Sequence, residues 1–188
     1  MVSRDFKADL HGCLREAREA LLWKLDGLSD YDMRRPLTFH GTNLLGLVKH
    51  LSGCEIGYFG WVFDRPFPDL PAWLAVEDDA TVDMWVRPEE SRADIVDLYR
   101  RACAHADAAI ETLGLDDRGR MPDGRAVTLH HVLVHMVAET TRHAGHADIV
   151  RELIDDSAGA HPDGAGLPDE DWPALRQRIE DAATEVRR

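Results

Sequence analysis

Glu139 and His143 are two residues whose types and spacing suit them to bind a metal ion. They are four positions apart, so on a helix their side chains project side by side, with Cβ atoms about 5–6 Å apart. The surrounding apolar residues place both on the face that a packed helix buries, where an unpartnered carboxylate or imidazole costs several kcal/mol. Both side chains must therefore be exposed, paired or bound to something, and Arg142 is an alternative partner for Glu139.

A third candidate ligand, His50, lies on the apolar seam of a different predicted helix, beside Leu47 and Cys54. Taken alone, it is more simply explained as a core histidine. Imidazole and carboxylate groups bind zinc and other divalent first-row metals. Three protein ligands leave at least one coordination position for water or substrate, which is typical of a catalytic site. The sequence therefore predicts a metal site formed by His50, Glu139 and His143.

Two neighbouring residues have roles that the sequence leaves open. His146 lies one turn beyond His143 and is the candidate catalytic residue. It could act beside the metal as an acid–base group, or replace Glu139 as the third ligand. Cys54 could be a fourth ligand or a nucleophile, although free cysteines are commonly small buried residues. A di-iron centre is disfavoured because it needs repeated Glu-x-x-His motifs and further glutamates on other helices.

Apolar residues that recur every three or four positions predict the helices that must position these side chains. Four long helices are expected over residues 5–29, 43–63, 92–113 and 129–154, and a short helix over 172–186. Thr42, Ser91 and Thr128 are the expected N-caps of the last three long helices. No convincing period-two strand pattern is present.

Residues 64–90 form a long connection between the second and third helices, because its prolines exclude a continuous helix. Connections of this length are often functional lids or crossovers. We expect Trp73, Met84 and Trp85 to fold back on the helices. The expected fold is all-α, a four-helix bundle with this connection as a crossover and a short C-terminal helix.

The chain is expected to form a single domain over residues 1–188, with a core bundle over about 5–155 and an extension over 156–188. In this extension, Trp172 and Leu175 are expected to anchor the short helix to the bundle. A length of 188 residues is sufficient for one substantial core.

Composition excludes several classes of function. The net charge is −13, from 35 acidic and 22 basic residues, which argues against unspecific nucleic-acid binding. No apolar run is long enough to cross a membrane, and the charged N-terminus lacks the apolar core of a signal peptide, so we expect a cytoplasmic protein. The 3 cysteines are far apart and form no CxxC motif, so neither a disulfide framework nor an all-cysteine zinc site is expected.

The segments TNLLGLVKHLSGCE and HMVAETTRHAGHADIVRELID resemble the DinB/YfiT-like superfamily, and the resemblance covers about residues 5–155. It implies a four-helix bundle of DinB/YfiT type, often dimeric, with a divalent metal at one end. Many members use a histidine from the second helix and a His-x-x-x-His pair from the fourth. Here Glu139 replaces the first histidine of that pair, and the resulting His, Glu, His set is similar to that of a relative, the N-terminal domain of mycothiol-dependent maleylpyruvate isomerase.

The resemblance implies a homodimeric, metal-dependent enzyme that transfers a low-molecular-weight thiol of the mycothiol or bacillithiol type to an electrophilic small molecule. Zinc is the first choice of metal, with nickel, iron and manganese as alternatives. No residues that bind the thiol are assigned. Two other hypotheses remain. One is a non-haem iron oxygenase, since two histidines and a carboxylate also form that site. The other is a dimeric metal-binding bundle without catalysis.

Overall fold

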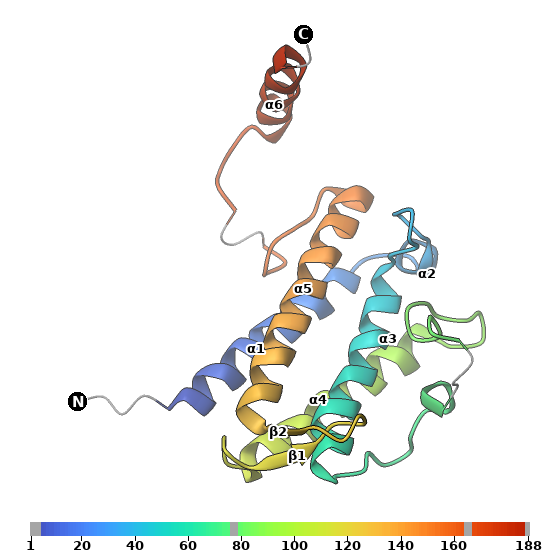
Figure 1. The fold of residues 1–188 in the computed structure, drawn as a ribbon. Coiled ribbons are helices and arrows are strands. Elements are labelled where there is room, and N and C mark those ends of the chain that lie inside the picture. Colours follow the sequence, from blue (N-terminus) through green and yellow to red (C-terminus); the bar gives the residue numbers. More distant parts are fainter. Residues whose placement is uncertain (1–4, 76–78, 164–166, 187–188) are drawn as a thin grey trace.

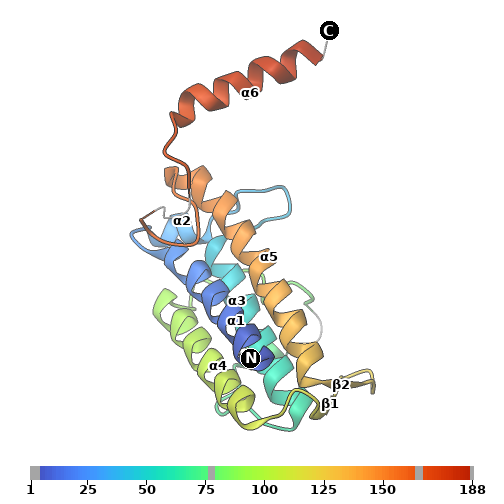
Figure 2. The same ribbon diagram turned by 90° about the vertical axis from the view of Figure 1, so that its left-hand side faces the viewer.

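The computed structural model describes residues 5–75, 79–163 and 167–186. As predicted, these residues are mostly helical, and four long helices lie side by side (Figures 1 and 2). They are α1 (Phe6–Leu22), α3 (Leu44–Glu55), α4 (Arg92–Thr112) and α5 (Leu129–Asp155). Helix α1 packs along α5, and α3 packs along α4 and also touches α5. None of the described helices is both long and apolar enough to span a membrane.

Side-chain caps explain where the helices begin. Ser91 accepts a hydrogen bond from the backbone N–H of Asp94, and Thr128 accepts one from His131, so both predicted N-caps are confirmed. The prediction for Thr42 is wrong by one residue. Asn43 is the N-cap of α3, because its Oδ1 accepts from the N–H of Gly46 at 2.8 Å.

The first predicted helix is divided in the structure. Helix α1 ends at Leu22 and continues as a 3-10 turn, η1 (Trp23–Leu25). A separate short helix, α2 (Asp30–Arg34), follows and was not predicted. Its N-cap, Ser29, accepts a hydrogen bond from the N–H of Asp32, which is a local capping signal that the apolar period does not reveal.

The second predicted helix is also irregular at its C-terminal end. Helix α3 ends at Glu55 and passes into a π-helical turn, η2 (Ile56–Gly60), and then a 3-10 turn, η3 (Trp61–Phe63). Asp64 ends the run in the left-handed conformation, with φ 55°. Single π-turns occur frequently at functional sites. This one directly follows the segment that carries His50 and Cys54.

A small antiparallel hairpin, which the sequence analysis missed, precedes α5. Its strands are β1 (Arg118–Arg120) and β2 (Ala126–Thr128), and Gly119 pairs with Val127. Strands of three residues are too short to show an alternating pattern. A Cβ at Gly119 would lie 2.4 Å from the carbonyl oxygen of Val62, so the hairpin backbone presses directly on η3.

Part of the long connection folds back on the helices, as predicted. It contains a 3-10 turn, η4 (Ala72–Ala75). Trp73 and Met84 pack against buried residues of the core, whereas Trp85 is 43% exposed, so its prediction is wrong. A Cβ at Gly46 would lie 2.0 Å from the Met84 carbonyl oxygen, which also accepts a hydrogen bond from Asn43 Nδ2. The end of the connection is therefore fixed on the first turn of α3.

The C-terminal helix α6 (Trp172–Val186) forms where predicted but extends away from the other helices (Figure 2). None of its described residues is buried, and Trp172 is 47% exposed. The predicted anchoring by Trp172 and Leu175 is therefore wrong. In α5, the buried seam runs through Ala147 and Val150, whereas Leu153 is exposed to solvent.

Candidate metal centre

The structure brings together the three predicted ligands, one from α3 and two from α5. One ligand atom from each of His50, Glu139 and His143 lies within 4.8 Å of the others. Glu139 Oε1 is 3.1 Å from His143 Nε2 and 3.6 Å from His50 Nε2. Glu139 therefore pairs with two histidines, whereas the alternative partner Arg142 is exposed.

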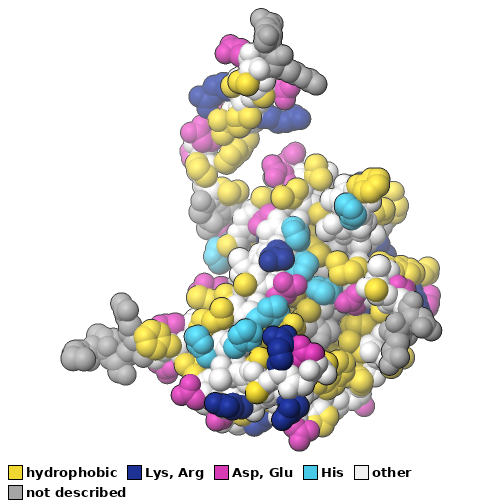
Figure 3. All heavy atoms as spheres, in the orientation of Figure 1, with side chains coloured by type: hydrophobic (Ala, Val, Ile, Leu, Met, Phe, Trp, Pro, Cys, Tyr) yellow, Lys and Arg dark blue, Asp and Glu magenta, His cyan; other side chains and the backbone are white. Residues whose placement is uncertain are grey.

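The cluster lies at the edge of the core and reaches the surface. The side chains of His50 and Glu139 are 20% and 21% exposed, and that of His143 is 10% exposed. Histidine side chains form a band over α5 on the face that Figure 3 shows. A small molecule could approach the cluster from this face, while the helices hold the ligand atoms in place.

Asp83, from the long connection, orients His50. Its Oδ2 is 2.8 Å from His50 Nδ1, which leaves Nε2 directed toward Glu139. The hydrogen bond to Asp83, followed by the contact with Cys54, raises the pKa of His50 to about 10, and the same bond lowers the pKa of Asp83. A carboxylate on the distal nitrogen of a histidine is the usual support of a metal ligand. The sequence analysis missed Asp83, whose only signal was its place in an acidic connection.

Of the three candidate ligands, His143 and Glu139 have pKa values shifted toward the forms that bind a metal. Burial, followed by the charge of His50, lowers the pKa of His143 and favours its neutral form. Burial tends to raise the pKa of Glu139, but the contacts with His143 and His50 outweigh it and hold that pKa below its usual value. Two imidazoles and one carboxylate thus face one another, and this donor set fits a divalent cation.

His146 lies beside His143 rather than within the cluster. The two Nδ1 atoms are 3.3 Å apart, so one ring donates a hydrogen bond and the other accepts it. This contact leaves His143 Nε2 free to face Glu139. His146 is exposed, and it does not replace Glu139 in the cluster.

Cys54 and Tyr58 follow His50 along the chain at intervals of four residues. Cys54 Sγ is 3.5 Å from His50 Nε2, but Cys54 is not part of the three-residue group. The Tyr58 ring, in the π-turn, lies 4.5 Å from the His135 ring on α5. The π-turn therefore supplies a side chain that extends the site along α5.

We expect Asp83→Asn to lower the affinity for zinc by about 10–100-fold, because an amide supports the His50 imidazole less strongly than a carboxylate. Competition with a chromophoric chelator measures this affinity. The matched control is Asp79→Asn, since Asp79 is a half-buried carboxylate of the same connection whose side chain, among the described residues, bonds only to the neighbouring Thr81. Equal zinc affinities of the two variants would show that Asp83 does not support the site.

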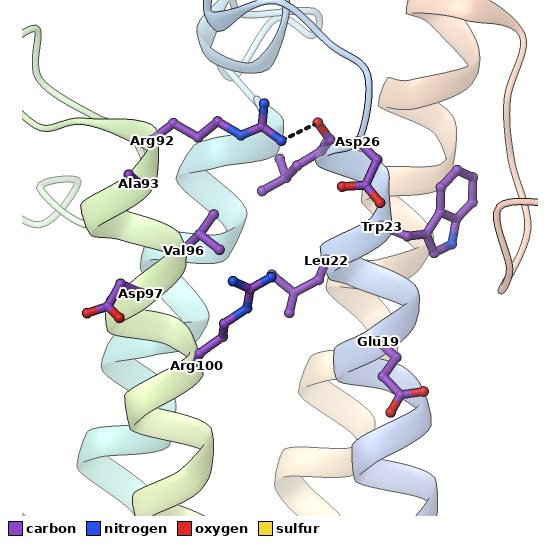
Figure 4. A pocket seen from close by; sticks show the side chains of 10 residues that line it. Glu19, Leu22, Trp23, Asp26, Arg92, Ala93, Val96, Asp97 and Arg100 are labelled. Atoms are coloured by element: carbon purple, nitrogen blue, oxygen red, sulfur yellow. Dashed lines mark hydrogen bonds between the residues drawn. The ribbon is translucent and has the colours of Figure 1, made fainter.

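A surface groove of about 540 Å³ lies elsewhere, between the C-terminal end of α1 and the N-terminal half of α4. Figure 4 shows that charged side chains of both helices surround Leu22 and Val96. Arg92 closes one end by donating to the Leu25 carbonyl oxygen at 2.9 Å. None of the candidate metal ligands lines this groove.

Residues 9–156 match the model of a family described as Mycothiol-S-transferase. The matched range includes all three candidate ligands, Asp83, His146 and the hairpin. No match is found among curated proteins or among solved structures.

Proposed function

Because the chain belongs to the mycothiol-S-transferase family, a DinB/YfiT-like family, we propose that it is a divalent-metal-dependent enzyme that joins a mycothiol-type thiol to an electrophilic small molecule. The observation that carries the proposal is the convergence of His50, Glu139 and His143 within 4.8 Å. Their two imidazoles and one carboxylate would hold zinc and leave a coordination position for the thiol. Zinc, the homodimer and a single-domain bundle of DinB/YfiT type over residues 1–188 are parts of this proposal.

A bound divalent ion would coordinate the sulfur and favour the thiolate, which is the reactive nucleophile. Asp83 keeps His50 Nε2 turned toward the site, and Glu139 keeps His143 Nε2 in place. In the transfer, a sulfur–carbon bond forms while the leaving group departs with its electron pair. We assign to the exposed imidazole of His146 the transfer of the thiol proton to solvent.

The test is conjugation of purified mycothiol with an iodoacetamide by the tag-free protein, with and without zinc. We expect a zinc-dependent rate that a chelator removes and that Glu139→Gln reduces to the rate of the reagents alone. The control variant is Glu152→Gln, an exposed glutamate on the same helix. A rate that requires iron and consumes oxygen would favour the oxygenase. Stoichiometric metal without any thiol transfer would favour the non-catalytic metal-binding bundle.

A further inference from the structure

A second surface hollow, of about 550 Å³, lies where the hairpin meets the start of α5. Its lining residues are Arg118, Arg125, Ala126, Val127, Thr128 and His131. All its titratable side chains are basic, although the chain carries a net charge of −13. Figure 3 shows basic side chains beside the band of histidines. A basic hollow on an acidic protein raises the local concentration of anions.

The guanidinium groups of this hollow have donors available. The Arg118 side chain is exposed, and its guanidinium makes no hydrogen bond or ion pair with any residue of the described ranges. Arg125 uses its Nε to donate to Asp123 Oδ2 at 2.7 Å. Its terminal nitrogens make no hydrogen bond within the part of the chain that the structure describes. Arginine binds carboxylates through such paired N–H groups.

The backbone holds these arginines in a fixed position. Gly119 presses on the Val62 carbonyl oxygen, which leaves no room for a Cβ. On the other side, the Leu129 N–H donates to the Asp117 carbonyl oxygen at 3.0 Å. Arg118 pairs with Thr128, the N-cap of α5. The hairpin is thus attached both to η3 and to the start of α5.

One face of α5 connects this hollow to the metal centre. His131, His135, Glu139 and His143 follow at intervals of four residues, so each side chain lies next to the following one along the helix. At a rise of 1.5 Å per residue, His131 and Glu139 are about 12 Å apart along the axis. An arginine side chain can cover part of that distance, so one small molecule can reach both places.

Tyr58 lies between the two charged groups. Burial is the main cause of its raised pKa, while the charge of Glu139 raises it further and that of Arg125 lowers it. The Tyr58 ring packs on His135, midway along the same face.

We propose that Arg118, Arg125 and His131 form an anion subsite that binds a carboxylate of one of the two substrates while its reactive group lies at the metal centre. This inference rests on the proposed function and names the substrate class: an electrophile or thiol with a carboxylate at the end distant from the reacting atom. The subsite selects the substrate and takes no part in breaking or forming bonds.

The first experiment compares iodoacetamidohexanoate with its uncharged amide, using mycothiol as the thiol. Sulfur–carbon bond formation releases iodide, and the thiol proton passes to buffer. We expect a kcat/KM about tenfold higher for the acid, which corresponds to about 1.4 kcal/mol. Arg118→Gln with Arg125→Gln should remove this preference by lowering kcat/KM for the acid toward the value for the amide. Arg120→Gln, which removes an exposed charge from the same hairpin but not from the hollow, should keep the preference.

A second arm pairs a carboxylated and an uncharged thiol with neutral iodoacetamide. A preference for the carboxylated thiol that the double variant loses supports the subsite and assigns it to the thiol. Equal kcat/KM values within both pairs would overturn the proposal.

Binding of unreactive acetamidohexanoate, measured by calorimetry, separates this proposal from the proposed function. If the protein has no transfer activity but binds the carboxylate, and the double variant does not bind it, the proposed enzymatic function is refuted and the anion subsite is supported. Transfer activity with no carboxylate binding or preference would refute the subsite alone.

Discussion

Replacing both His50 and His143 with alanine is expected to remove nearly all the divalent metal from the tag-free protein. The wild-type protein should retain about one ion per chain, because two imidazoles and a carboxylate meet at one point. The double variant leaves Glu139 as the only remaining ligand of the set, and a single carboxylate binds zinc weakly. Elemental analysis after extensive dialysis gives both stoichiometries.

The control for this experiment is a His40→Ala, His130→Ala double variant, since both residues are exposed and lie outside the cluster. It should keep the wild-type metal content. If the wild-type protein takes up no zinc even after soaking, Glu139 and His143 are an ordinary polar pair and the assignment fails. Iron in place of zinc would instead favour the hypothesis of a non-haem iron oxygenase.

Arg18→Ala is expected to destabilise the fold by about 3–5 kcal/mol, because it leaves a buried carboxylate without its cation. Arg18 donates from Nε and Nη2 to the two oxygens of Glu55, each at 2.7 Å. It also donates to Asp107 at 2.6 Å, so one side chain joins α1, α3 and α4. The side chain of Glu55 is 0% exposed. Urea unfolding at neutral pH measures the change in free energy.

Two controls isolate the buried pair. Replacing the pair by Arg18→Met with Glu55→Leu should recover most of the lost stability, since apolar side chains of similar size need no partner there. Arg101→Ala removes an exposed pair with Asp97 and should change the free energy of unfolding by less than about 1 kcal/mol. If Arg18→Ala were no more destabilising than Arg101→Ala, Arg18 would not be important for stability.

The three candidate ligands could be predicted because each places a polar side chain on an otherwise apolar seam. Asp83 could not, since it is 33 positions from His50 in an irregular connection, where no period relates the two. The burial of three cationic side chains could not be predicted from the sequence either. Arg18, Lys24 and Lys49 resemble surface residues in the sequence, and only their distant partners show that they belong to the interior.

The regular parts of the long helices were predicted well because they follow a period, while their ends and the short elements depend on local bonds. Thr42 and Asn43 are both good N-caps, and a contact with Met84 from the distant connection accompanies the choice of Asn43. The hairpin owes its position to the close approach of Gly119 to η3, a contact with no counterpart in local sequence preference.

The π-turn Ile56–Gly60 has a consequence for which sequence changes this protein can accept. A π-turn holds about one residue more than an α-helical turn, so every later position is rotated by about 100° relative to a regular helix. Upstream, α3 must present His50 to Glu139, and downstream, η3 must present Val62 to Gly119. If a single residue within 56–60 were lost, the helix could keep either the contact of His50 with Glu139 or the contact of Val62 with Gly119, but not both. Length variation in this lineage should therefore accumulate in the linker before α6, whereas the length of the 56–60 segment stays constant.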